Sequence, residues 1–176
     1  MIYGRIPEED VIYRFKAAMP KGSKLSYNEV RSGRMHFRKV AKISHLHHGV
    51  AAEWVGGSLG ERTVVKKGKK KKEVVYNPGK LKVTEPVELW FVWRFRLKND
   101  EGHNRLKSMD SGNCQAMSKG LEDGLVRCGL MDNDTNAYVT WVSNLSLPMS
   151  NEERGKLKND EVELFICKTS LYGKKA

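Results

Sequence analysis

The sequence has few cysteines and no long apolar run, and each absence excludes a class of protein. Its three cysteines, Cys114, Cys128 and Cys167, are an odd number without CxxC spacing. Neither a disulfide framework nor a zinc knuckle is predicted, and we expect a reducing compartment. No segment approaches the roughly 20 apolar residues of a membrane span. Charged side chains interrupt residues 1–21, which lack the apolar stretch of a secretory signal. We therefore expect a cytoplasmic protein without a membrane partner.

Motifs that mark small-molecule enzymes are also missing. The sequence contains no P-loop, no GxGxxG after a predicted strand and no GxSxG, so no small-molecule cofactor is expected. Positive charge, by contrast, is in excess, because 32 Lys and Arg against 21 Asp and Glu give a formal charge of +11. This charge attracts phosphate polyanions. Nucleic acid is the first partner to consider, although ribosome-associated and membrane-surface proteins are also basic.

Length and apolar spacing predict a single α+β domain over residues 1–176. With 39% apolar residues, the chain is long enough to bury one core. The apolar periods of three to four residues and of two residues separate helices from strands. The predicted elements are helices over 34–54 and about 114–128, and strands over 87–97, about 138–147 and 161–168. Because strands and helices intermix, we expect a mixed β-sheet packed with helices.

The predicted helix near residues 114–128 has readable ends. Asp110 or Ser111 is positioned to cap its start, and Gly129 follows at the expected stop position. Gly120 and Gly124 lie one turn apart, which predicts the close approach of a neighbouring backbone.

A Lys-rich segment interrupts the chain at about residues 61–82. Two short β-branched runs flank the sequence KKGKKKK, which is the pattern of a hairpin with a cationic tip. One interpretation is a solvated loop, and the other is an arm that follows a phosphate backbone. On the second interpretation Lys69, Lys70, Lys71 and Lys72 are DNA-binding residues.

The HLHH run, with His45, His47 and His48, has the composition of a metal cluster. No nearby carboxylate or cysteine completes a ligand set, and the three side chains do not share one helix face. We therefore favour surface or core positions for these residues.

Carboxylates and one lysine carry the candidate chemistry. Phosphodiester hydrolysis uses divalent cations held by hard oxygen ligands. Asp110 precedes the second predicted helix, and Asp132 and Asp134 follow it, so only the fold can bring these ends together. Lys119 and Asp123 stand at i and i+4 and can pair. An ordinary surface ion pair and an ordinary acidic turn remain the alternatives.

Residues 110–139 carry a longer pattern. It runs Asp, then Asn three residues later, then Lys, then Asp-x-Leu, then Gly, then an acidic pair just before a strand. The positions are filled by Asp110, Asn113, Lys119, Asp123, Leu125, Gly129 and Asp134. This pattern resembles the RusA family of Holliday-junction resolvases. LSYN at 25–28, RMHFRK at 34–39 and VELFIC in the last strand resemble the flanks of that family, so the similarity covers about residues 25–168.

The resemblance implies a homodimeric endonuclease that nicks four-way DNA junctions with Mg²⁺, or alternatively Mn²⁺, in a bacterial or phage-infected cell. It implies the following roles: catalysis for Asp110, Lys119 and Asp134; metal binding for Asp110, Asp134 and Asp132; and support of these groups for Asp123 and Asn113. DNA contacts are expected from Asn28, Arg34, His36, Arg38 and Lys39 of the N-terminal flank and from Arg105 and Lys107 of the polar loop before Asp110.

Two positions depart from the family pattern. Gly112 and Asn133 stand where the best-known members carry further carboxylates. Asp132 is positioned to compensate. The first alternative is therefore a protein of the same fold that binds junctions and cuts them weakly or not at all. The second is a basic RNA-binding protein, which leaves the pattern of residues 110–134 unexplained.

Overall fold

A computed structural model describes residues 1–33, 35–96, 111–135 and 137–169. Its elements are η1 (Glu8–Asp10), β1 (Val11–Ala18), α1 (Tyr27–Arg31), α2 (Phe37–Trp54), β2 (Ser58–Lys66), β3 (Lys69–Asn77), β4 (Val87–Arg94), α3 (Gln115–Arg127), β5 (Val139–Ser146), α4 (Asn151–Lys156) and β6 (Glu161–Lys168). The predicted α+β class and the mixed sheet are confirmed.

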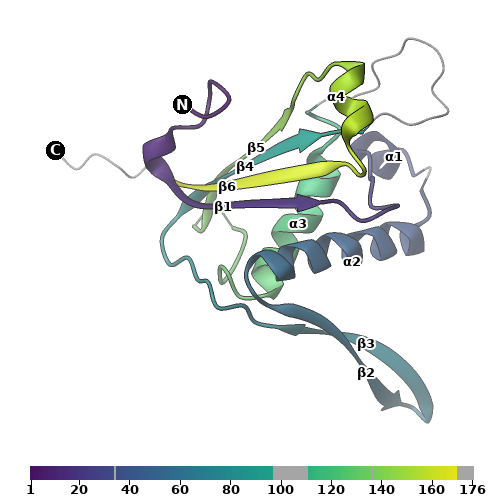
Figure 1. Cartoon of the computed structure of the whole chain (residues 1–176). Coiled ribbons are helices and arrows are strands. Elements are labelled where there is room, and N and C mark those ends of the chain that lie inside the picture. Colours follow the sequence, from purple (N-terminus) through teal and green to yellow (C-terminus); the bar gives the residue numbers. More distant parts are fainter. Residues whose placement is uncertain (34, 97–110, 136, 170–176) are drawn as a thin grey trace.

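Four strands form the central sheet in the order β1-β6-β4-β5. β6 lies antiparallel to β1 and to β4, whereas β5 lies parallel to β4. A parallel pair needs a crossover, and α3 lies in the connection between β4 and β5. Figure 1 shows α2 and α3 on the same side of this sheet.

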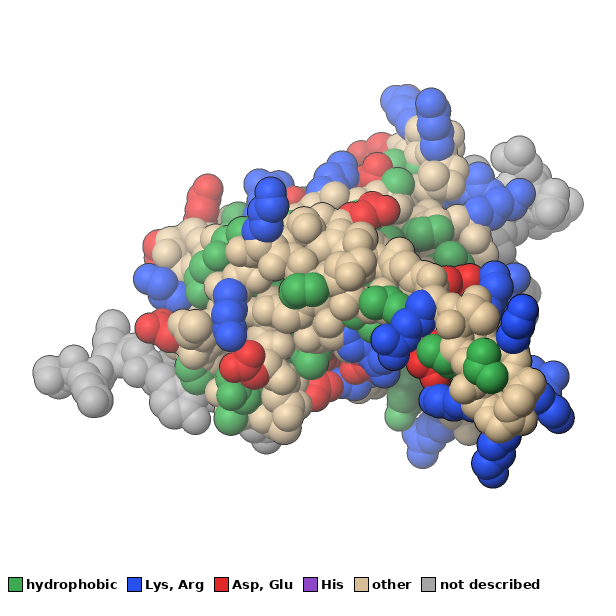
Figure 2. Space-filling model, turned by 90° about the horizontal axis from the view of Figure 1, so that it is seen from below, with side chains coloured by type: hydrophobic (Ala, Val, Ile, Leu, Met, Phe, Trp, Pro, Cys, Tyr) green, Lys and Arg blue, Asp and Glu red, His purple; other side chains and the backbone are tan. Residues whose placement is uncertain are grey.

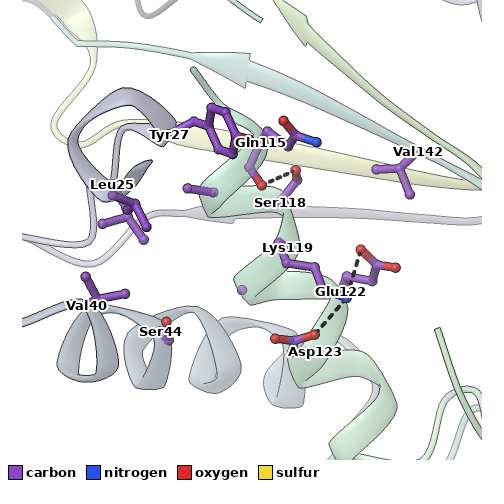
Figure 3. A pocket seen from close by; sticks show the side chains of 13 residues that line it. Leu25, Tyr27, Val40, Ser44, Gln115, Ser118, Lys119, Glu122, Asp123 and Val142 are labelled. Atoms are coloured by element: carbon purple, nitrogen blue, oxygen red, sulfur yellow. Dashed lines mark hydrogen bonds and ion pairs between the residues drawn. The ribbon is translucent and has the colours of Figure 1, made fainter. Parts of the chain in front are cut away.

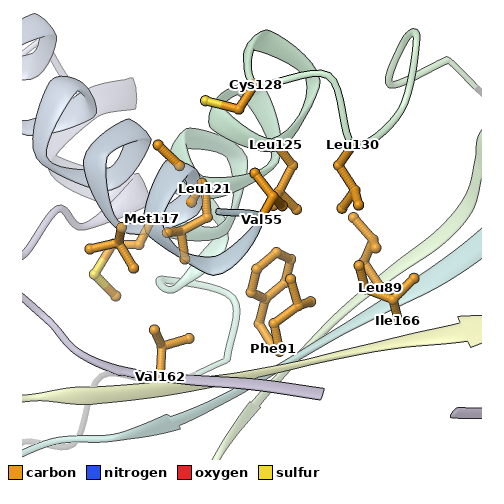
Figure 4. Close-up of a cluster of buried hydrophobic side chains, with 14 of the residues drawn as sticks. Val55, Leu89, Phe91, Met117, Leu121, Leu125, Cys128, Leu130, Val162 and Ile166 are labelled. Atoms are coloured by element: carbon orange, nitrogen blue, oxygen red, sulfur yellow. The ribbon is translucent and has the colours of Figure 1, made fainter. Parts of the chain in front are cut away.

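The main core lies between the sheet and these two helices. Met117, Leu121 and Leu125 project from α3 at helical spacing and are at most 2% exposed. They face apolar side chains of the strands, such as Phe91 and Val162 (Figure 4). Burial of each such side chain contributes about 1.5–3 kcal/mol. The core therefore fixes which face of α3 remains at the surface.

The predicted close approach of a neighbouring backbone is confirmed at Gly124 of α3, whereas Gly120 approaches a side chain of α2. A Cβ on Gly120 would lie 2.4 Å from Nδ1 of His47, and one on Gly124 would lie 2.8 Å from the Cβ of Ala51. His47 and His48 are buried on α2, as the core interpretation predicted. Burial lowers the pKa of both imidazoles, to about 4 for His48.

The start of α3 differs from the prediction. Its N-cap is Cys114, without a capping side chain, so the helix begins four residues after Ser111. The Ser111 hydroxyl instead accepts a hydrogen bond from the Ser146 amide of β5, at 3.2 Å. The prediction that Ser111 caps the helix was wrong, and Asp110, the other candidate, lies outside the described residues. Gly129, with φ of 78°, does lie in the left-handed region just after the helix.

The Lys-rich hairpin is confirmed, but over residues 58–77. β2 and β3 are joined by Lys67 and Gly68, both with positive φ, as a two-residue turn of this kind requires. Residues 78–82 lie beyond the hairpin, and the Lys80 amide donates to the Val55 carbonyl at 2.8 Å. Figure 1 shows the hairpin projecting from the body of the molecule beyond α2.

Candidate functional site

One turn of α3 presents a lysine and two carboxylates on the same side. Lys119 Nζ lies 3.0 Å from an oxygen of Asp123, at i+4, and 3.8 Å from an oxygen of Glu122, at i+3. The Lys119 side chain is half exposed, whereas that of Glu122 is 8% exposed. Burial of the apolar face of α3 determines which side of the helix is exposed. Positions i, i+3 and i+4 then lie together on that side because of the helical period.

Asp134 joins these groups from the segment after the helix. Buried Leu130 and Met131 hold the start of that segment against the core, and the Asp134 amide donates to Asn133 Oδ1 at 2.8 Å. The Asp134 carboxylate then accepts a hydrogen bond from the Lys119 ammonium. The fold thus brings together Lys119 and Asp134, which the sequence separates by 15 residues.

The charges of this cluster shift each other's pKa. Burial lowers the pKa of Lys119, but hydrogen bonds to Asp134 and Asp123 outweigh it and raise that pKa overall. The hydrogen bond from Lys119 lowers the pKa of Asp134. Desolvation raises the pKa of Glu122 to about 7. One ammonium thus contacts three carboxyl groups, and the cluster favours additional positive charge.

The donor chemistry of the cluster fits a hard divalent cation. Carboxylate oxygens are the ligands that Mg²⁺ prefers. The carboxylates of Asp123 and Asp134 both contact the Lys119 ammonium, so they lie on the same side of α3. Within the described ranges, no group of three or more His, Cys, Asp or Glu side chains is arranged as a complete metal-ligand set. Asp110, the other expected ligand, lies outside the described residues.

Asp132 takes a different partner. One of its carboxylate oxygens lies 3.2 Å from Nζ of Lys82, and both side chains are largely exposed. Its role as a metal ligand stays a prediction.

The segment at residues 25–28 meets the chain just before the first turn of α3. Oδ1 of Asn113 accepts hydrogen bonds from the Ser26 hydroxyl at 3.1 Å and from the Asn28 amide at 3.4 Å. The Tyr27 amide donates to the Asn113 carbonyl at 3.1 Å. Asn113 therefore holds the segment that carries Asn28 beside the helix that carries Lys119.

The remaining basic candidates lie on exposed ends of elements. His36 caps α2, where its Nδ1 accepts from the Arg38 amide at 3.2 Å, and Arg38 and Lys39 are exposed. Phe37, beside them, is 71% exposed. Three further candidates, Arg34, Arg105 and Lys107, lie outside the described residues.

The hairpin divides into a neutralised part and a cationic tip. Lys72 pairs with Glu61 across the strands, and Lys66 pairs with Glu73. In the described part of the chain, no carboxylate pairs with the lysines of the hairpin tip, which are Lys67, Lys69, Lys70 and Lys71. All four are exposed, and Figure 2 shows Lys and Arg side chains gathered over the projecting end.

Sequence reasoning missed two features of the site. Glu122 was not singled out, although its position one residue before Asp123 places it at i+3 from Lys119. The other is a cavity of about 360 Å³ beside Lys119, lined by residues of α1, α2, α3 and β5 and by Leu25 (Figure 3). No local sequence signal predicts a cavity, because its walls come from segments far apart in the chain.

Comparison of the chain with protein-family models, curated proteins and solved structures finds no match. None of the helices within the described ranges has both the length and the apolar content that a membrane span requires.

Proposed function

We propose that this chain is a Mg²⁺-dependent endonuclease that nicks branched DNA, such as a four-way junction. The observation that carries the proposal is the contact of Lys119 with Asp123 and Asp134 at the surface of α3. Phosphodiester cleavage needs a cation that binds the phosphate and carboxylates that hold a divalent metal, and this cluster supplies both chemistries.

Each residue of the cluster has a definable task. An ammonium has three N–H donors. Asp123 and Asp134 are its close acceptors, and Glu122 lies farther away at 3.8 Å, so the third N–H would turn from Glu122 to a phosphate oxygen and stabilise its charge in the transition state. Asp123 also fixes the direction of the Lys119 side chain. Asp134, with Asp110, would hold Mg²⁺, which supplies an activated water and neutralises charge on the phosphate.

The basic surfaces support DNA as the substrate. The exposed hairpin tip and the basic start of α2 provide cations for the backbone of duplex arms, and a two-stranded ribbon of this kind fits the major groove of B-form DNA. We further propose a homodimer, since two symmetry-related sites address two strands of a junction.

A nicking assay on a labelled synthetic junction tests the proposal. Nicks that require Mg²⁺ and are absent on linear duplex of the same sequence support it. Tight junction binding without nicking would instead support a binding protein with degenerate chemistry. Preference for A-form RNA over junction DNA in competition would support the RNA-binding alternative.

A further inference from the structure

The cavity beside Lys119 has two chemically distinct ends. Leu25, Val30 and Val40 line its apolar end, and the Tyr27 side chain, 37% exposed, lies at the rim. Lys119 and Asp123 line the other end (Figure 3). The volume of about 360 Å³ is within the range of small-ligand sites, which are mostly apolar with a few polar groups. The cavity therefore suits a ligand with a flat apolar part, whose anionic group would bind Lys119 when a cation offsets the charge of the Glu122 and Asp123 carboxyl groups that also line it.

A nucleotide unit of the proposed substrate has this division. Its base is planar and stacks on aromatic rings, and its phosphate is the anion that Lys119 would bind. Ser44 and Gln115 also line the cavity, and their hydroxyl and amide groups can form hydrogen bonds with the edge of a base.

We propose that this cavity takes up one unstacked nucleobase of the DNA, next to the phosphate bound by Lys119. The inference rests on the proposed function and deepens it. Extruding a base from an intact duplex costs a few kcal/mol. The cost is lowest for a base that is already unpaired. A site that needs an unstacked base beside the scissile phosphate therefore selects branched DNA over linear duplex, without reading its sequence.

Binding in EDTA to junctions with a single abasic position tests this inference. Each nucleotide at the branch point is made abasic in turn, so that the backbone stays and only the base is removed. We expect one position at which loss of the base weakens wild-type binding about tenfold. This is the usual contribution to affinity of one base that stacks on an aromatic side chain. Equal affinity of the wild-type chain for the intact and all the abasic junctions overturns the inference.

A filled cavity provides the second arm of the test. Ser44→Trp places an indole in the cavity from α2, and its neighbour His45→Trp is the matched control, because His45 is exposed and does not line the cavity. Ser44→Trp should weaken binding to the intact junction about tenfold and abolish the effect of base loss. His45→Trp should behave as wild type. Unchanged sensitivity of Ser44→Trp to base loss contradicts the inference.

The Tyr27 pair covers the case in which Ser44→Trp fails to fold. Tyr27→Phe keeps the ring and should keep the base dependence, whereas Tyr27→Ala should lose it. The experiment is separate from cleavage, because it is read without metal. Base-dependent binding without nicking in Mg²⁺ overturns the proposed chemistry alone, and absence of binding to any junction overturns both proposals.

Discussion

Lys119 is the residue on which the proposed chemistry depends most. Its ammonium contacts Asp123 and Asp134 and lies 3.8 Å from Glu122. The surface-pair interpretation of the sequence accounts for only the contact with Asp123. A surface ion pair contributes about 0–1 kcal/mol, whereas a lysine that stabilises charge in a transition state contributes several.

Lys119→Met should lower the nicking rate at saturating Mg²⁺ at least about 100-fold, the usual effect of removing a group that stabilises the transition state. Junction binding in EDTA should change far less, because many other cations contact the backbone. Lys156→Met is the matched control, since Lys156 forms an i, i+4 pair with Glu152 on α4, at 2.7 Å. An equal effect of both variants on nicking would contradict a catalytic role and show that Lys119 is an ordinary surface residue.

Glu163 has the clearest structural charge in the described part of the chain. Its side chain is 2% exposed and lies 2.5 Å from Arg14 and 3.2 Å from Arg94. Burial raises the pKa of this carboxyl, but hydrogen bonds from Tyr3, Arg14 and Arg94 outweigh it and lower the pKa overall. The lowered pKa means that the ionised form stabilises the folded state.

Glu163→Gln should lower the free energy of unfolding by about 2 kcal/mol at pH 7, because the hydrogen bonds to a charged group are removed. The stability from Glu163 is full above the unfolded-state pKa of about 4.5 and is lost as the pH falls through the lower folded-state pKa. Denaturant unfolding from pH 7 to pH 3 should therefore show the two proteins converging. Glu161→Gln, on the same strand and paired with the half-exposed Lys16, should cost less than about 1 kcal/mol. A constant difference at all pH values would contradict the assignment.

At the scale of elements, the packing of α2 on α3 positions the site. The two helices approach so closely that a Cβ on Gly124 would lie 2.8 Å from the backbone Cα of His48. The same packing forms one wall of the cavity beside Lys119.

Gly120→Ala and Gly124→Ala should each lower the free energy of unfolding by about 1–3 kcal/mol, the usual cost of overpacking. Gly49→Ala is the control on α2, because no atom of the described residues beyond its own helix and neighbours lies within 4 Å of its Cβ position. That change should raise stability by about 0.5–1 kcal/mol, since alanine loses less entropy in a helix. Thermal unfolding measures the signs, and equal effects of all three variants would contradict the packing account.

The hairpin tip should contribute to DNA binding through its lysines. Changing Lys67, Lys69, Lys70 and Lys71 to Gln should weaken junction binding and flatten its dependence on salt, by a slope of about 0.9 for each phosphate that is no longer neutralised. The control is the double variant Glu61→Gln with Lys72→Gln, which removes a pair and leaves the net charge unchanged. If the tip variant binds as wild type at every salt concentration, the hairpin is a solvated loop.

Most elements could be predicted from local patterns, and those that were missed are short or half-buried. β1 alternates Tyr13, Phe15 and Ala17 against the core, but its other face is charged and its partner β6 is about 150 residues away. α4 has only six residues and no apolar stripe. The sequence nevertheless contains a signal for the start of α4, because Ser150 and Glu153 have the spacing of a capping box and form one in the structure.

At the scale of the whole molecule, the site depends on contacts that no local pattern encodes. The pairing of Lys119 with Asp123 follows from helix periodicity, and the pairing with Asp134 follows from the path of the chain after α3. Glu122 was missed because a charged helical residue normally faces solvent, whereas here its side chain is 8% exposed. The net charge of +11 follows from composition. The run of lysines predicted a hairpin with a cationic tip, but not that the hairpin projects from the body of the molecule (Figure 1).

The most direct test of the central claim is nicking of a four-way junction by the Asp134→Asn variant in Mg²⁺. The variant lacks the carboxylate that meets Lys119, and Asp110→Asn should behave alike. We predict paired nicks by the wild-type chain and by the surface control Glu152→Gln, and none above the EDTA background by Asp134→Asn, with junction binding retained. Nicking by Asp134→Asn at the wild-type rate would contradict the proposed active site.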